Sequence, residues 1–196
     1  MFRTSRLNTV VVPLIALVAL LTLASHRVDA QVKPFKVKGG GNAPQGLSLD
    51  PSKVSRYTMS GNATHVGKYS GFGIANVITY APGPHPDGAF LHGSFSGGFV
   101  FVAANGNRLV CEHPGTFVVY PVGEGQFYAI FDAIFTPTSL NIGGAIYEST
   151  GKFLNVDGSF RMIATTELFT IDFANSVTSE FDLSWVGEGS LVFPKE

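Results

Sequence analysis

The chain has 196 residues, of which 45% are hydrophobic, 12% are aromatic and only 14% are charged, against about 25% charged residues in an average globular protein. The combination of 23 glycines and 17 phenylalanines, with no three-residue glycine period, excludes collagen, a coiled coil, a helical repeat array and a charged disordered tail. The formal net charge of −1 argues against a nucleic-acid partner bound through its phosphates.

Residues 1–30 have the order of a secretory signal peptide. Arg3 and Arg6 make a positive start, residues 10–24 form an uncharged apolar run of 15 residues, and the stretch ends in a small residue, Ala30. The apolar run is shorter than the ~20 residues that cross a bilayer. We therefore expect cleavage after Ala30, secretion or a periplasmic location, and no membrane span in the mature chain. The alternative interpretation is an uncleaved N-terminal anchor.

Residues 31–54 predict a flexible leader. The stretch contains three consecutive glycines, Gly39 to Gly41, together with three prolines and four lysines, and it has no sustained hydrophobic period. We therefore expect the folded domain to span residues 55–196.

Regular alternation begins near Arg56. Residues Tyr57, Met59, Gly61, Ala63 and His65 fall on one face of an extended chain, and polar side chains fall on the other. This pattern is typical of a half-buried antiparallel strand. A second strand is expected over residues 69–80, and the proline-rich residues 81–88 predict a loop.

Asn105 and Gly106 give the strongest hairpin signal of the chain, between strands expected over residues 95–104 and 107–111. A two-residue turn would place Cys111 opposite Val100, and a three-residue loop would shift this pairing by one residue. Further strands are expected at residues 116–120, 126–135, 141–147, 152–164, 168–173 and 179–185. Short strands at about ten-residue spacing predict an all-β fold, a single antiparallel closed β-barrel of about eight strands.

Three motifs resemble a known family. They are GNATHVG at residues 61–67, FVAANGNRL at residues 101–109 and STGKFLNVDG at residues 149–158. Together they resemble a group of exported bacterial proteins of uncharacterised role, and the third is similar to a motif of allene oxide cyclases and plant dirigent proteins. The resemblance implies export and an eight-stranded antiparallel barrel. It carries over no active-site residue, and Asn107 and Val156 depart from the family pattern.

Four residues are candidates for lining a ligand pocket: Tyr57, Met59, His65 and Asp132. His65 would fix the orientation of an apolar guest, although a histidine that hydrogen-bonds the backbone is the favoured alternative. Asp132 interrupts an apolar strand, where burial would raise its pKa and suit it to acid–base chemistry or to anchoring a ligand. The favoured alternative for Asp132 is a strand-end carboxylate bound by backbone N–H groups.

The remaining reactive side chains give no catalytic assignment, and we expect no cofactor and no metal. His85, His92, Glu112 and His113 match no zinc-ligand spacing and are expected to be solvated loop residues. Cys111, the only cysteine, is expected to be a small buried hydrophobe.

Three functions follow from these features. The first is non-enzymatic binding of a small hydrophobic molecule inside the barrel, since eight strands enclose room for one small ligand. The second is an isomerase or cyclase like allene oxide cyclase, which requires His65 and Asp132 to point into the same cavity. The third is a structural or surface-interaction protein that self-associates as a homo-oligomer through outward apolar residues.

Overall fold

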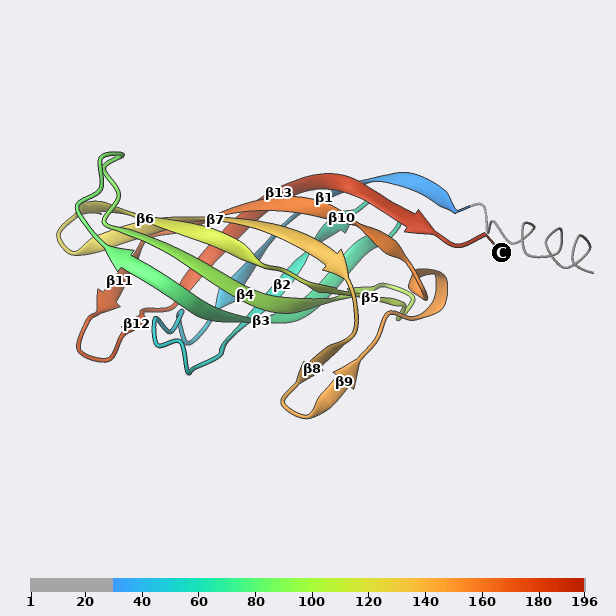
Figure 1. The fold of residues 1–196 in the computed structure, drawn as a ribbon, viewed down its shortest axis with the longest axis horizontal. Coiled ribbons are helices and arrows are strands. Elements are labelled where there is room, and N and C mark those ends of the chain that lie inside the picture. Colours follow the sequence, from blue (N-terminus) through green and yellow to red (C-terminus); the bar gives the residue numbers. More distant parts are fainter. Residues whose placement is uncertain (1–29, 196) are drawn as a thin grey trace, which may run out of the picture.

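The computed structural model describes residues 30–195, so the expected signal peptide lies outside the described residues apart from Ala30. The domain is an all-β closed barrel with eight strand positions, all antiparallel, as the sequence predicted (Figure 1). Around the barrel the strands are β1 (Gln31–Ala43), β2 (Ser55–Ala63), β3 (Gly67–Pro82), β4 (Leu91–Ala103), β5 (Arg108–Glu112) with β6 (Gly115–Gly123), β7 (Gln126–Pro137), β10 (Asp157–Thr166) and β13 (Phe181–Phe193). Pairing of β13 with β1 and of β7 with β10 closes the ring.

Strands β5 and β6 share one position in the barrel. β4 pairs with β5 through Gly98–Val102 and with β6 through Leu91–Phe95, and both short strands also pair with β7. The break between them falls at His113 and Pro114, where proline has no N–H to donate to a ladder. His113 thus sits at an interruption of the wall, held by its amide, which donates to the Gly97 carbonyl at 3.0 Å.

The flexible leader predicted for residues 31–54 is wrong, because residues 31–43 form β1, a central strand. β1 pairs with β13 along its whole length and with β2 from Val37 to Asn42. Phe35 is completely buried. A Cβ on Gly39 would lie 2.7 Å from the Trp185 ring, so this glycine lets the indole cross the strand. Gly39 and Gly41, two of the three glycines that suggested flexibility, are therefore packing positions.

The connection from β1 to β2 is also held in place. Leu47 and Leu49 are buried. The Leu47 amide donates to the Thr178 hydroxyl at 2.8 Å, and the Thr178 amide donates to the Leu47 carbonyl at 3.0 Å. Thr178 belongs to the short strand β12 (Val177–Thr178), which pairs with β11 (Phe169–Asp172). These segments lie over one end of the barrel.

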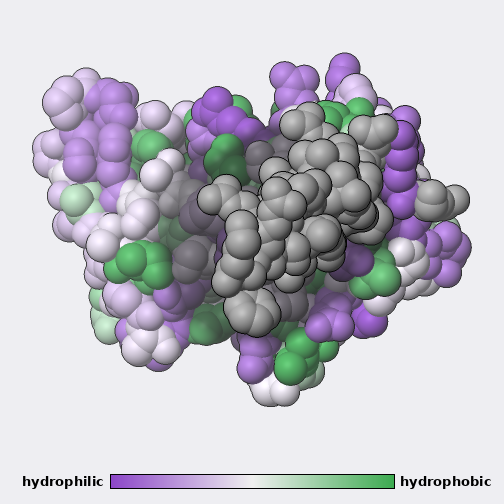
Figure 2. Space-filling model, turned by 45° about the vertical axis from the view of Figure 1, so that its right-hand side comes forward, coloured by the Kyte–Doolittle hydropathy of each residue, from purple (hydrophilic) through white to green (hydrophobic). Residues whose placement is uncertain are grey.

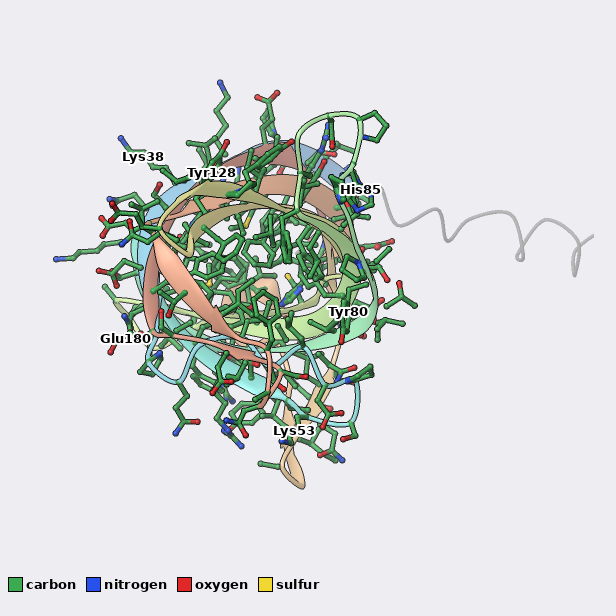
Figure 3. The ribbon with its side chains drawn as sticks, turned by 90° about the vertical axis from the view of Figure 1, so that its left-hand side faces the viewer. Lys38, Lys53, Tyr80, His85, Tyr128 and Glu180 are labelled. Carbon is green, nitrogen blue, oxygen red and sulfur yellow. The ribbon has the colours of Figure 1, made fainter. Side chains whose placement is uncertain are left out.

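Inward side chains fill most of the barrel with aromatic rings. Phe160 contacts three of them, with ring centroids 4.5 Å from Phe35, 5.1 Å from Phe135 and 6.0 Å from Phe101. Viewed toward one end of the barrel, the ring of strands encloses carbon-rich side chains, whereas Lys38 points away from it (Figure 3). Phe153, in the 3-10 turn Gly151–Phe153, adds a further fully buried ring to this core.

Two details of the hairpins refine the predicted strands. The Asn105-Gly106 turn is the three-residue alternative, because Cys111 pairs with Phe99 and Gly106 has φ of 82°. The single strand expected over residues 141–147 is a hairpin, β8 (Leu140–Ile142) and β9 (Ala145–Tyr147), which projects from the barrel (Figure 1). It covers a small second core around Val100 and Val110 on the outer side of the wall.

The outer surface mixes apolar and polar residues. On the face shown in Figure 2, hydrophobic side chains form separate small groups among hydrophilic ones. Ile134, Ile163 and Val186 are exposed on the outer face of β7, β10 and β13. Among residues 30–195 there is no helix with the length and apolar character needed to span a membrane.

Candidate ligand cavity

One apolar cavity lies inside the barrel near the start of β2 and the 44–54 connection. The space open to the centre of a water-sized sphere is about 80 Å³, and a single water needs ~10–15 Å³ by this measure. The cavity therefore has room for several waters or for one small molecule. Its lining consists of Ala43, Gly46, Leu47, Ser55, Arg56, Tyr57, Met59, Ala75, Phe95, His113, Phe131, Ala133, Phe135, Met162, Ala164, Phe181, Leu183 and Trp185.

Small residues at inward positions create this space. Ala133 lies between Phe131 and Phe135 on β7, and all three side chains point into the barrel. On β10, Ala164 pairs with Phe131, and Ala133 pairs with Met162. Alanines placed among large rings leave a volume that the neighbouring side chains do not fill, which is how small barrels hold one ligand.

A polar pair, Tyr57 and His113, lies in the wall of the cavity. The Tyr57 hydroxyl and His113 Nε2 are 2.6 Å apart, and His113 is only 2% exposed. Two glycines make room for the pair. A Cβ on Gly73 would lie 2.4 Å from the Tyr57 hydroxyl oxygen, and a Cβ on Gly97 would lie 2.5 Å from His113 Cε1. Any larger residue at either position would displace one of the two rings.

Burial keeps this pair neutral at pH 7. Desolvation lowers the pKa of His113 to about 4, although the backbone carbonyls of His113 and Gly98 act in the opposite direction. Desolvation raises the pKa of Tyr57 far above its ordinary value. His113 Nδ1 is buried and makes no hydrogen bond of normal geometry among the described residues. The pair is therefore a neutral polar pair in apolar surroundings.

The other polar side chains of the lining bond elsewhere. Trp185 Nε1 donates to the Tyr69 hydroxyl at 2.9 Å. The Ser55 hydroxyl oxygen accepts from the Ser48 amide at 2.8 Å. The Arg56 guanidinium extends toward the β8–β9 turn on the outer side of the wall, 3.6 Å from where a Cβ on Gly143 would lie. The surface that the cavity offers to a guest is therefore almost entirely carbon.

The structure divides the four pocket candidates into two that line the cavity and two that do not. Tyr57 and Met59 line it. His65 lies in the β2–β3 turn with φ of 67°, and its Nε2 lies 3.1 Å from the Pro34 carbonyl oxygen. The pocket prediction for His65 is wrong, because the strand ends at Ala63 and the alternation does not reach the turn. The backbone-bonded alternative is confirmed.

The pocket prediction for Asp132 is also wrong. Its side chain lies on the outer face of β7, where Arg161 Nε donates to its Oδ1 at 2.7 Å and a second guanidinium nitrogen bonds Oδ2. The hydrogen bonds from Arg161 hold the pKa of this carboxyl below its usual range, opposite to the rise that burial would cause. The strand-end alternative is wrong as well, since Asp132 pairs with Ile163 in the middle of the ladder. Phe131 and Ala133 occupy the inner face instead.

His113 is the site residue that the sequence interpretation missed. It was expected to be a solvated loop residue and is instead buried. Leu109, Cys111 and His113 alternate along the chain, and all three are buried, so the period-2 pattern of β5 continues into the break. That alternation was the available signal.

The other members of the histidine group behave differently. His92 and Glu112 are strand residues rather than loop residues, at the start of β4 and the end of β5. The His92 imidazole bonds the carboxylate of Asp87 in the exposed β3–β4 loop at 2.9 Å, and Glu112 is exposed. Within the described part of the chain, no three His, Cys, Asp or Glu side chains form a group that could hold a metal ion. Cys111 is a free, fully buried thiol whose pKa is raised by burial, as expected for a small hydrophobe.

Comparison with known proteins gives no relative, because no family model, no curated protein and no solved structure matches the chain. The resemblance to exported bacterial proteins, allene oxide cyclases and dirigent proteins stays a prediction. Any function for the cavity is therefore inferred from the geometry and chemistry of its own residues.

Proposed function

We propose that this protein binds a small apolar molecule, without transforming it, in the cavity of its barrel. The supporting observation is a carbon-lined space in an interior that aromatic rings otherwise fill. Removing apolar surface from water supplies about 25 cal/mol for each Å² buried, so such a space favours an apolar guest over water. Export directed by residues 1–30 would place this binding in the periplasm or outside the cell.

Catalysis by an isomerase or cyclase is less well supported. That function required His65 and Asp132 to share a cavity, and they lie in a turn and on the outer wall. The pair that does line the cavity has pKa values moved away from neutrality in both directions, with His113 at about 4 and Tyr57 above its ordinary value. Efficient acid–base groups have pKa values near the working pH. Tyr57 and His113 are thus a weak acid and a weak base at pH 7.

Self-association is a second candidate function, favoured by one observation. Ile163 pairs directly with Val186 on the outer wall, and these side chains are 41% and 65% exposed. Burying such neighbours against a second copy would remove apolar surface from water. Size-exclusion chromatography with light scattering should then give a mass above that of one chain, and a strict monomer at high concentration would count against this candidate.

The binding proposal is tested with toluene as an apolar probe. Trp185 is the only tryptophan of the chain and lines the cavity, so its emission reports directly on occupancy. Titration should give a saturable change in emission and a matching rise in unfolding temperature, because a ligand that binds only the folded state stabilises it.

Two variants on neighbouring positions of β10 locate the bound probe. Ala164→Leu fills the cavity and should weaken toluene binding at least tenfold, whereas Thr165→Leu changes the exposed outer face and should leave it unaltered. The proposal fails if the unmodified protein shows no saturable response. It also fails if folded Ala164→Leu protein binds toluene as tightly as the unmodified protein does.

A further inference from the structure

The chemistry of the guest can be inferred from what the polar atoms of the lining already do. The indole N–H of Trp185 is used by Tyr69, at 2.9 Å, and the Tyr57 hydroxyl is used by His113 Nε2, at 2.6 Å. The remaining imidazole nitrogen, Nδ1 of His113, is buried and has no hydrogen-bond partner among the described residues. The Tyr57 oxygen could still accept a second hydrogen bond, but the lining surface that a guest touches is almost entirely carbon, so a guest meets almost no exposed donor or acceptor.

The charged and hydroxyl groups near the cavity do not change this. The Ser55 hydroxyl oxygen accepts a hydrogen bond from the Ser48 amide. The Arg56 guanidinium extends along the outer wall toward Gly143. A polar group carried into the cavity would lose its hydration and find no replacement hydrogen bond, which penalises it as transfer into a hydrocarbon solvent does. The penalty falls on the functional group of the ligand, whatever the shape of its carbon skeleton.

The carbon lining also indicates the shape that fits. Phe95 and Phe131 meet edge to face with centroids 5.5 Å apart, and Phe135 and Trp185 add further ring surface. Aromatic rings pack well against other rings in offset or edge-on contacts. Met162 contributes a flexible thioether that adapts to irregular guests. A space large enough for several waters can hold a single ring or a short branched chain.

We propose that the part of the ligand held inside the barrel is a bare hydrocarbon group, a single ring or a branched chain without any hydrogen-bonding atom. This inference rests on the proposed binding function and specifies its ligand class. The Tyr57–His113 pair then stabilises the barrel wall and makes no hydrogen bond to the ligand. Any polar group of the natural ligand stays at the mouth, in contact with water.

The test compares two probes of nearly equal size, toluene and phenol, on the full chain, with Trp185 emission and isothermal titration calorimetry as readouts. Phenol replaces the methyl group by a hydroxyl, so the ratio of the two dissociation constants measures whether the cavity offers that hydroxyl a partner. We expect phenol to bind at least tenfold more weakly than toluene, because water-to-hydrocarbon transfer penalises an unpaired hydroxyl by this factor or more. A ratio below tenfold overturns the inference.

Tyr57→Phe separates the wall pair from ligand recognition. If the Tyr57 hydroxyl serves only His113, this variant leaves the phenol-to-toluene ratio unchanged within a factor of two, and a larger change in the ratio contradicts the inference. The ratio in the unmodified protein decides the question even if this variant does not fold. Failure of the binding function itself looks different, since neither probe would then give a saturable signal.

Discussion

Acid should destabilise this protein through one buried imidazole. His113 has a pKa of about 4 in the folded protein and an ordinary value of 6.5, so between these values the unfolded chain binds a proton that the folded chain does not. Stability therefore falls as the pH is lowered through this window and is fully present above it. The gap of 2.5 pH units, at 1.36 kcal/mol per unit, corresponds to roughly 3 kcal/mol at pH 4.

Urea unfolding at pH 7, 5.5 and 4, followed by the emission of Trp185, measures this loss. The matched control is the double variant Tyr57→Phe/His113→Phe, which removes both partners of the 2.6 Å hydrogen bond and leaves neither polar group unpaired. Between pH 7 and pH 4 the unmodified protein should lose about 3 kcal/mol more than the double variant. Equal pH dependence in the two proteins would refute the assignment of a low pKa to His113 and with it the neutral pair.

Three further predictions concern positions outside the pair. Phe35→Ala should lower the free energy of unfolding, measured by urea titration, by about 3–5 kcal/mol, because Phe35 is fully buried. Lys36→Ala, at an exposed position, should change it by no more than about 0.5 kcal/mol. Equal effects of the two substitutions would contradict β1 as a core strand. Asp132→Asn should lower the free energy of unfolding by at most about 1 kcal/mol, because the ion pair with Arg161 is partly exposed to solvent. The variant should also bind toluene as tightly as the unmodified protein does. Weaker toluene binding would show that Asp132 contributes to the ligand site. Cys111 should react with a thiol reagent only at the rate of unfolding, as a fully buried thiol with a raised pKa, and fast labelling of the native protein would show that the wall opens locally.

The barrel could be predicted from the sequence because most strands carry their own local signal. Alternation from Tyr57 to Ala63 marks the inward face of β2, and the Asn105-Gly106 turn marks the hairpin of β4 and β5. Turn residues between short β-rich runs then favour antiparallel neighbours. These signals depend only on residues close in the chain, so pattern and structure agree.

β1 was not predicted because its consecutive glycines are typical of a flexible segment. Phe35 and Val37 do alternate with lysines, but Gly39 and Gly41 continue the inward face with no side chain to show it. Their reason lies elsewhere in the chain, in the Trp185 ring that crosses Gly39 and in the Met59 side chain beside Gly41. A glycine required by a distant neighbour looks the same in sequence as a glycine in a mobile loop.

The candidate site depends on the register between strands, which no local pattern specifies. β7 has apolar side chains on both faces, so alternation alone does not show whether the Asp132 side chain faces the inside or the outside of the barrel. Pairing of Phe131 with Ala164 and of Ala133 with Met162 sets small residues beside large ones and opens the cavity. A shift of one residue would turn every one of these side chains to the opposite face. The cavity is thus a property of the pairing between β7 and β10, and the same pairing places Asp132 outside, beside Arg161, where it cannot contact a guest.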